Sequence, residues 1–487
     1  MLDLIAVLLA LGLLMYLAFR GISLLILAPV MAMLAVALTG GLPALVPLAA
    51  YTQVFMGATG GFIVSFFPLF LLGAIFGKLM DDSGSARAIA ETVITRLGPD
   101  RAILAVVLCC AVLTYGGVSL FVVAFAIFPI AAALFRGAEI PKRLIPGALA
   151  LGAFTFTMSA LPGTPAIQNA IPMPFFGTTA FAAPGLGIIT AAIMFGLGML
   201  WLNRRAATAR DLGEGYGAHS DAVSAPDPAR REVAALEGFD TQEIEPSAPP
   251  PAAQPGFALA VTPVVLVIAV NFVVVEYLLP AADTSWLDRD EFGPTTLEAV
   301  RGVWSIIIAL TVAILVLIAT NFTRLTTLKH SVGSGAEASV LPIFNTASLV
   351  GFGAVIAALP VFTVISNALL DIGGGNPLIS LAIAVNILSA ITGSASGGMS
   401  IALDALGATY VRIAEETGTS LEAMHRVTAV ASGALDALPH NGAVITVLGI
   451  CKLTHREAYY DIFMVAVVFP MIALVVLITL ATLFGAF

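Results

Sequence analysis

The sequence predicts an all-α polytopic membrane protein with about ten transmembrane helices and two re-entrant hairpins, arranged as two inverted-topology repeats. Three observations lead to this fold class. The first is composition: of 487 residues, 59% are hydrophobic and 10% are charged, and residues 21–77 and 144–203 carry no charge at all. Soluble folds of this length do not contain such stretches, whereas a chain that crosses a bilayer many times requires them.

The second observation is an internal repeat. Three features of the sequence recur at one offset of 277 residues, in the pairs Gly98 and Gly375, Gly116 and Gly393, and Leu161 and Leu438. Each half is expected to contain five crossings and one hairpin that does not cross. Because five is odd, the second half must be inverted relative to the first.

The third observation is the placement of basic residues. With the N-terminus outside, 17 of the 21 Lys and Arg lie on the cytoplasmic side, and the exceptions are Arg289, Arg301, Arg412 and Arg426. The positive-inside rule then predicts that both termini lie outside. The first apolar segment follows Asp3 without a basic n-region, so we expect it to be retained as a span. The expected location is the cytoplasmic (inner) membrane of a bacterium.

The first repeat, residues 1–205, is expected to have spans at 4–19, 21–38, 61–79, 143–161 and 185–203. An uncharged loop rich in Gly and Pro precedes the third span, and the charged, amphipathic stretch 78–101 suits a helix in the membrane interface. Residues 102–135 are uncharged, too long for one crossing, flanked by basic residues and interrupted at 114–117. This pattern predicts a hairpin that enters from the cytoplasm.

Residues 206–256 are polar and rich in proline, which predicts a disordered cytoplasmic linker. The second repeat, residues 257–487, is expected to have spans at 257–279, 302–320, 339–360, 424–438 and 460–485. A second uncharged stretch, interrupted at 392–398, predicts a hairpin over about 372–410 that enters from outside.

Each repeat also contains a broken helix, at 161–169 and at 438–442. Pro439 removes a backbone donor and Gly442 relaxes the backbone inside an apolar segment that also holds Asp436 and His440. A broken helix near the membrane midplane, beside ionisable residues, is typical of substrate sites in secondary transporters. The alternative is a proline kink whose polar groups are satisfied by neighbouring helices.

The two hairpin tips and the two breaks are predicted to converge on a substrate. Helix N-termini favour an anion, glycines allow close backbone approach, and hydroxyl and amide groups can follow a carboxylate and its hydroxyls. The candidate substrate-binding residues are Thr114, Tyr115, Gly116, Gly117, Ser119, Thr164, Gln168, Asn169, Ser394, Ser396, Gly397, Gly398, His440 and Asn441. None is Lys or Arg, which favours a monocarboxylate over a di- or tricarboxylate. The alternative is that Ser, Thr and Gly serve tight helix packing.

The candidates for proton coupling are Asp436, His440 and Asp404. A buried carboxylate or an imidazole can carry a proton together with an anion. Asp436 and His440 are four residues apart and would share a helix face if the helix continued that far. Asp436 could instead cap the broken helix, His440 could donate to substrate, and Asp404 could lie in a polar vestibule. The sequence predicts no cofactor and no metal ligand set, and Cys109, Cys110 and Cys451 are expected to be buried fillers.

Three segments of the chain resemble the gluconate permease (GntP) family of the ion transporter superfamily: F-G-K-L-M-D-D-S-G-S-A-R-A-I-A-E-T-V-I-T-R-L-G at 76–98, L-P-G-T-P-A-I-Q-N-A-I-P at 161–172 and G-S-A-S-G-G at 393–398. The resemblance implies proton-coupled uptake of gluconate, glycerate, hydroxybutyrate or related small organic anions. It also implies a homodimer with an elevator-type mechanism. Gluconate transporters of this family carry an acidic residue at the first tip, where this chain has Thr114 to Gly117, so Asp436 or His440 is expected to take over the proton role.

The alternatives belong to several classes. Sodium coupling is open, because carbonyls and hydroxyls at the hairpin tips also suit Na⁺. A channel would need a continuous pore, and an inverted repeat within one chain favours alternating access instead. A membrane enzyme would need a nucleophile with its base, and only Asp436 with His440 offers a pair, so no enzymatic activity is expected. The expected partners are a small organic anion, the lipid bilayer and a second copy of the chain, without nucleic acid.

Overall fold

The computed structural model describes residues 2–20, 22–39, 45–218, 240, 253–293 and 295–487. Within these ranges the chain is α-helical with short 3-10 and π-helical turns, and no strand occurs. The helices of the first half are α1 Leu2–Phe19, α2 Leu24–Leu38, α3 Val46–Ala49, α4 Met56–Asp82, α5 Ser85–Leu97, α6 Ala102–Tyr115, α7 Leu120–Gly137, α8 Ile145–Ala153, α9 Phe156–Ser159, α10 Ile167–Ala170, α11 Pro172–Phe176 and α12 Pro184–Asp211.

The helices of the second half follow the segment 219–252, most of which lies outside the described residues. They are α14 Phe257–Val273, α15 Leu279–Ala281, α16 Leu297–Asn321, α17 Leu328–Ala338, α18 Val340–Ala358, α19 Phe362–Ile372, α20 Pro377–Thr392, α21 Ala395–Thr417, α22 Leu421–Ser432, α23 Gly442–Cys451, α24 His455–Phe463 and α25 Phe469–Phe484. The predicted all-α polytopic fold class is confirmed.

Seven of the described helical stretches are long and apolar enough to cross a membrane, or eight if α5 and α6 count as one bent span. The apolar helices α1, α2, α20 and α23 are shorter. The structure corrects the start of the third predicted span: where a loop was expected before residue 61, one helical stretch runs from Val46 to Asp82 through a π-helical turn. In hydrocarbon an uncharged segment satisfies its backbone best as a helix, even when it is rich in glycine.

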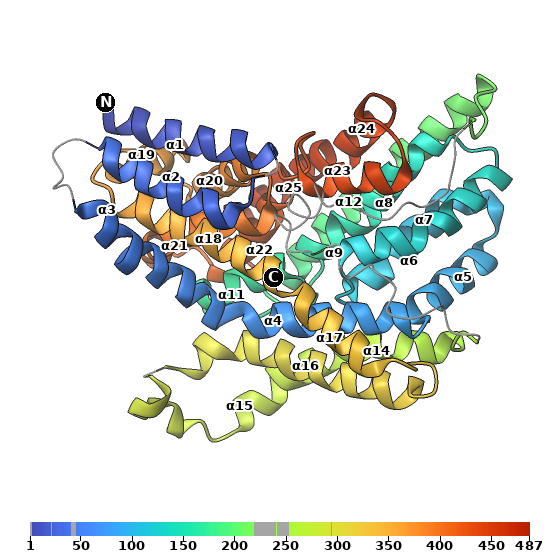
Figure 1. Cartoon of the computed structure of the whole chain (residues 1–487), viewed down its shortest axis with the longest axis horizontal. Coiled ribbons are helices and arrows are strands. Elements are labelled where there is room, and N and C mark those ends of the chain that lie inside the picture. The colour runs from blue at the N-terminus through green and yellow to red at the C-terminus, as the bar shows by residue number, and fades with distance from the viewer. Residues whose placement is uncertain (1, 21, 40–44, 219–239, 241–252, 294) are drawn as a thin grey trace.

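Both predicted hairpins are helix–turn–helix units. α6 and α7 pack against each other across a turn at 116–119, and α20 and α21 do so across Gly393 and Ser394. α5 meets the stretch Pro99–Tyr115 at an angle of 107°, in line with an interfacial helix that leads into a hairpin. Figure 1 shows α6 and α7 toward one end of the molecule and α20 and α21 toward the other.

Both predicted breaks are present. α8 ends at Ala153, and only the short helices α9, α10 and α11 follow before α12. In the second half α22 ends at Ser432 and α23 begins at Gly442, which corrects the predicted end of the ninth span at 438. Asp436 and His440 therefore lie in an irregular connection and do not share a helix face.

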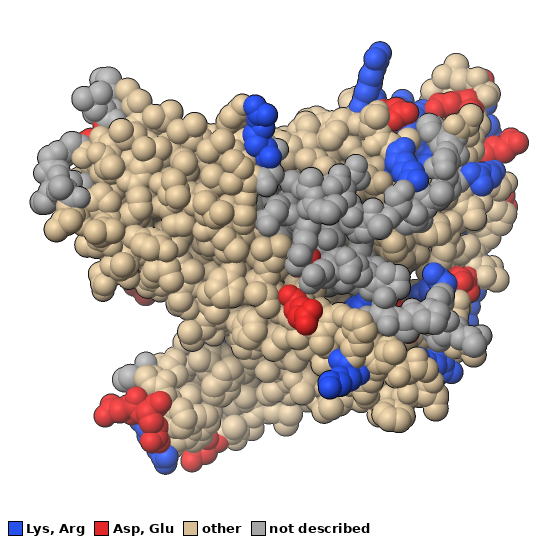
Figure 2. Space-filling model, viewed as in Figure 1, with Lys and Arg blue, Asp and Glu red and all other residues tan. Residues whose placement is uncertain are grey.

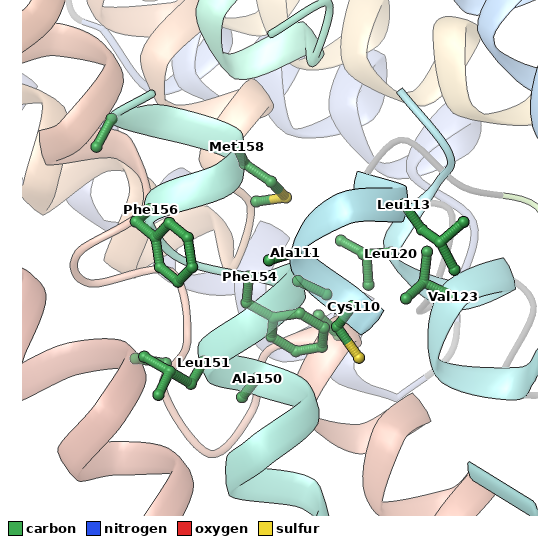
Figure 3. Packing of buried hydrophobic residues seen from close by; sticks show 14 of the residues in the cluster. Cys110, Ala111, Leu113, Leu120, Val123, Ala150, Leu151, Phe154, Phe156 and Met158 are labelled. Atoms are coloured by element: carbon green, nitrogen blue, oxygen red, sulfur yellow. The ribbon is translucent and has the colours of Figure 1, made fainter. Parts of the chain in front are cut away.

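The first hairpin packs tightly on the helices that lead to the first break. Figure 3 shows Cys110 and Ala111 of α6 beside Phe154 and Met158, whereas Leu113 lies toward Val123 of α7. A side chain at Gly152 would meet Cys110 Cβ at 2.5 Å, so α8 lies against α6 with almost no separation. Cys109, Cys110 and Cys451 are all buried and free, as fillers are expected to be. The first hairpin is thus anchored to α8 and α9 by close apolar packing.

An ionic cluster around the buried carboxylate of Asp461 joins the two halves. The carboxylate of Asp461 in α24 accepts hydrogen bonds from Arg143 Nη1 at 3.2 Å, Arg205 Nε at 3.0 Å and Trp201 Nε1 at 3.0 Å. Arg143 also binds Glu214 at 2.6 Å. The predicted linker is therefore wrong for its first residues, since α12 continues to Asp211 and the next turn is held by Arg143. Residues 219–239 and 241–252 of that prediction lie outside the described residues.

Candidate functional site

The first hairpin tip is built by its glycines and by Ser119. Gly117 has φ +94°, and a side chain at Gly116 would meet Val264 of α14 at 2.5 Å, so both positions require glycine for the turn and for packing. Ser119 is the N-cap of α7 and accepts from the N–H of Val122 at 3.5 Å. The Tyr115 hydroxyl donates to the carbonyl of Pro162 at 2.7 Å. The tip is therefore fastened to the first break.

The first break is held by a buried network centred on Asn169. Its Nδ2 donates to the carbonyls of Thr164 at 3.0 Å and Ala180 at 2.9 Å. Its Oδ1 lies 3.0 Å from Arg426 Nη1 and 3.2 Å from His425 Nε2. An amide offers two donors and two acceptor positions, and all four are used. Asn169, predicted to bind substrate, has its hydrogen-bonding capacity taken up by the protein and is a structural anchor in this structure.

Sequence reasoning missed Arg426 and His425. Arg426 is fully buried and donates to Ala180, Ala182 and Ser159 carbonyls as well as to Asn169, so all five of its N–H groups have acceptors. Within the described chain no carboxylate lies within ion-pair distance of this guanidinium. The sequence signal was present, because an arginine inside an apolar membrane segment is rare and usually functional.

His425 is also fully buried, and its Nδ1 lies 2.6 Å from Thr178 Oγ1. With its Nε2 on Asn169, the imidazole joins α22 to two parts of the first break. Both ring nitrogens thus face protein atoms. His425 belongs to the same anchor as Arg426.

The second tip is fastened to the second break in the same manner. Asn441 donates to the carbonyl of Gly393 at 3.0 Å and, as the N-cap of α23, accepts from the N–H of Val444 at 3.1 Å. His440 Nε2 lies 3.0 Å from the carbonyl oxygen of Ala390. Each tip is therefore held by the broken segment of its own half.

The polar groups of the second tip begin α21. Ser394 is its N-cap and accepts from the N–H of Gly397 at 3.1 Å, and its hydroxyl lies 3.3 Å from that of Ser396. A side chain at Gly397 would meet Leu349 of α18 at 2.5 Å, and one at Gly398 would collide with the backbone of Ser389. These two glycines, predicted to contact substrate, serve close helix packing here.

Of the three predicted coupling residues, Asp404 lies apart from the other two. Asp436 is 6% exposed and lies in the connection between α22 and α23 together with His440. Asp404 is exposed on α21, about 15 Å along the helix from Ser394 at 1.5 Å per residue. Among the described residues, no group of three or more His, Cys, Asp or Glu is placed to hold a metal ion.

A cavity of about 120 Å³ opens at the first tip. Four predicted residues line it, namely Thr114, Gly117, Ser119 and Gln168. The remaining described lining was not predicted and comes from α4, from the junction of α17 and α18, and from neighbours of the tip and the break: Leu69, Phe70, Gly73, Ala74, Val118, Leu120, Met158, Pro165, Ala166, Ile167, Ala338 and Ser339. No residue of this lining is charged.

The cavity can hold a small polar molecule with an apolar flank. Drug-sized ligands occupy pockets of about 300–1,000 Å³, so this volume suits a ligand smaller than a typical drug. The Thr114 hydroxyl oxygen is buried and has no partner among the described residues, and the N-terminus of the 18-residue helix α7 lies at the wall. An unpartnered hydroxyl beside a helix N-terminus suits a carboxylate.

No family model matches the chain. The solved structure of MtrF from Neisseria gonorrhoeae, whose title concerns a class of antimetabolite efflux pumps, covers 94% of this chain and 94% of its own, with a TM-score of 0.53 and 14% identity. This likeness concerns the fold alone. An uncharacterized transporter of Haemophilus influenzae is 33% identical over 98 residues, 20% of this chain and 23% of that protein.

The uncharacterized transporter YxjC of Bacillus subtilis is 45% identical over 482 residues, which cover 97% of this chain and 98% of that protein. With its polytopic helical fold, the chain belongs to the family of membrane transporters that includes YxjC.

Proposed function

We propose that the chain is a secondary active transporter that carries a small organic monocarboxylate together with protons. The observation that carries this proposal is the cavity at the first hairpin tip. It is small, it lacks charged side chains in its described lining, and it offers the Thr114 hydroxyl and the amide of Gln168. A di- or tricarboxylate would need a fixed cation there, whereas hydroxyls and a helix N-terminus suffice for one carboxylate.

The substrates proposed are gluconate, glycerate, hydroxybutyrate and similar sugar acids or hydroxy acids. The resemblance of 76–98, 161–172 and 393–398 to the gluconate permease family supports this class. Arg426 adds an electrostatic reason, because its charge is buried and Glu422, one turn earlier on α22, is exposed and not within ion-pair distance, so the positive charge raises the local potential for an anion. Its N–H groups are occupied, so it acts through its field and through the anchor it forms, without touching the substrate.

The proposed mechanism is of the elevator type. The proposed assembly is a homodimer in which each chain contains two inverted repeats. Support comes from the fastening of each tip to the break of its own half, through Tyr115 and Pro162 in the first half and through Asn441 and Gly393 in the second. A unit with these ties can move with its substrate while the tips and breaks keep their relative positions. The opposite placement of the two hairpins in Figure 1 supports access from the two sides of the membrane in turn.

For the coupling ion we propose a proton carried by Asp436 or His440. Both lie in the second break, and Asp436 is the buried carboxylate of that segment. Sodium remains the second candidate, since the Ser394 and Ser396 hydroxyls are gathered at the second tip.

The test is uptake of labelled gluconate, glycerate and 3-hydroxybutyrate by the purified protein in liposomes, with proton and Na⁺ gradients imposed separately. Accumulation of one of these acids above the external concentration is expected with an inward proton gradient alone, and a protonophore should abolish it. Protein-free liposomes are the control. Accumulation only with Na⁺ would replace the proton by sodium, equilibration without accumulation would indicate a channel, and no carboxylate movement would contradict the proposal.

A further inference from the structure

Asn345 of α18 is a buried polar residue whose amide is unused. The residue is 1% exposed, and neither its Nδ2 nor its Oδ1 has a hydrogen-bond partner within the described residues. Leaving a buried donor or acceptor unpaired costs about 1–3 kcal/mol per group, so a side chain with both groups unpaired has a cost that a structural role does not explain. An apolar residue of the same size would cost less at this position.

The packing of α18 on α21 shows what Asn345 faces. These helices lie side by side (Figure 1). A side chain at Gly397 would meet Leu349 at 2.5 Å, and one at Gly353 would meet Ile401 at 2.9 Å. From the first pair to the second, α18 advances from 349 to 353 and α21 from 397 to 401. The two helices therefore run parallel and in register. One turn before Leu349, Asn345 is level with Gly393 and Ser394, the turn of the second hairpin.

The chemistry at this turn suits an anion. α21 has 23 residues and begins after Ser394, whose side chain caps the N–H of Gly397 and whose carbonyl accepts from Gly398. The N–H groups of Ala395 and Ser396 belong to the first turn of this helix, where donors have no partner inside the helix. The hydroxyl of Ser400, one turn further along, is also buried without a partner.

We propose that Asn345 is a substrate-binding residue that reads the hydroxyl group of a hydroxy acid at the second hairpin tip, a second position for the substrate beside the cavity at the first tip, whose lining residue Ser339 lies six residues earlier in the chain. Its Nδ2 donates to the carboxylate, which the first N–H groups of α21 also face, and its Oδ1 accepts from the substrate hydroxyl. A ligand with a carboxylate acceptor and a hydroxyl donor one or two carbons along the chain satisfies both amide groups, whereas a simple cation would leave Nδ2 unpaired. This inference rests on the proposed carboxylate transport and names its specificity.

The test compares transport of 3-hydroxybutyrate and butyrate, which differ only in the hydroxyl, by the full-length protein in liposomes. The wild type is expected to prefer 3-hydroxybutyrate by about tenfold or more, because a site built for a hydroxyl leaves groups unpaired with the analogue that lacks it. Asn345→Leu should reduce this preference to near one. The same variant should unfold at an unchanged or higher temperature, because it removes two unpaired groups; a structural asparagine would give a lower one.

Thr346→Val is the matched control. Thr346 is the next residue of α18 and is equally buried, but its hydroxyl already donates to the carbonyl of Pro342 at 3.0 Å. The preference for 3-hydroxybutyrate should survive this change. Asn345→Asp serves as the second variant, since it keeps the size and places a negative charge against the carboxylate, and it should lose uptake of both acids.

The outcomes separate the two proposals. If the wild type accumulates no carboxylate, the proposed function fails and this inference fails with it. If the wild type transports 3-hydroxybutyrate and Asn345→Leu keeps the hydroxyl preference, only the role of Asn345 is overturned. If Asn345→Leu does not fold, the side chain has a structural role, and uptake retained by Asn345→Asp would then refute the substrate contact.

Discussion

At the scale of single residues, Arg426 has the largest fully buried side chain of the described residues, and the free-energy cost of burying its charge is offset by five hydrogen bonds. Its five N–H groups meet carbonyls of the first break and Asn169. Arg426→Lys keeps the charge but supplies only three donors for four buried acceptors, so at least one acceptor loses its bond to this side chain at about 1–3 kcal/mol. We expect thermal unfolding of the purified protein to shift down by several degrees and transport to be lost.

Arg412→Lys is the control for this change. Arg412 pairs with Glu416 at 2.6 Å on the exposed face of α21, where such pairs contribute about 0–1 kcal/mol. The unfolding temperature should hardly change. An equal shift in the two variants would show that the buried network does not stabilise the break.

Gly73 makes a second residue-scale prediction, because it lines the cavity and a Cβ added there meets nothing within 4 Å. Gly73→Ala would place a methyl group in the cavity and favour the helix by about 1 kcal/mol. We expect the ratio of kcat/KM for gluconate to that for glycerate to fall about tenfold, since one methylene in a pocket is worth 10–200-fold. Gly60→Ala, on the same helix with the same open surroundings but away from the cavity, should leave the ratio unchanged.

At the scale of elements, the fastening of tip to break gives a separate prediction. Asn441→Asp keeps the cap of α23, since a carboxylate also accepts from Val444, but it cannot donate to the carbonyl of Gly393. The opening free energy of the second tip should fall by about 1 kcal/mol, which makes amide exchange over 393–398 about fivefold faster.

Asn376→Asp is the matched control at the other end of the same hairpin. Asn376 caps α20 through Leu378 and donates to Thr482 at an exposed site. Exchange at the tip should stay at the wild-type rate. If both variants open the tip equally, the added charge is responsible and the bond to Gly393 is not.

The hairpins and the broken helices were predictable because the residues at these positions determine the local backbone structure. Glycine pairs and prolines in uncharged stretches marked both hairpins and both breaks. Helix α4 was missed over 46–60 because its glycines and prolines also predict a loop, and only the lack of water in the bilayer makes a helix the better solution. The turn after α12 was missed because its order depends on Arg143, a residue distant in sequence.

At the scale of the whole molecule, the site depends on contacts that no local pattern contains. Thr114, Ser119 and Gln168 were predicted from their position at a tip and a break, and they line the cavity. Asn345 and Gly73 could not be predicted, because an unpaired amide and an open space beside a glycine are properties of the packed chain. Asn169 was assigned to the substrate because its local sequence does not show that its amide binds Arg426 and His425, which come from the other half of the chain.

The proposed inversion of the two halves leads to the last prediction. Figure 2 shows Lys and Arg gathered toward the end where α6 and α7 lie, and an acidic group at the opposite end. If this asymmetry follows the positive-inside rule, the open ends of the two hairpins face opposite sides of the membrane. Gly137→Cys after the first hairpin should react with an impermeant maleimide only from the cytoplasm, and Glu415→Cys after the second only from outside. Leu212→Cys is the reference for the predicted cytoplasmic side and Ser285→Cys for the predicted outside, and both positions are exposed. The native cysteines are buried and should not react with the maleimide. Labelling of both hairpins from one side would refute the inverted repeat, because hairpins that open on the same side belong to halves of the same orientation.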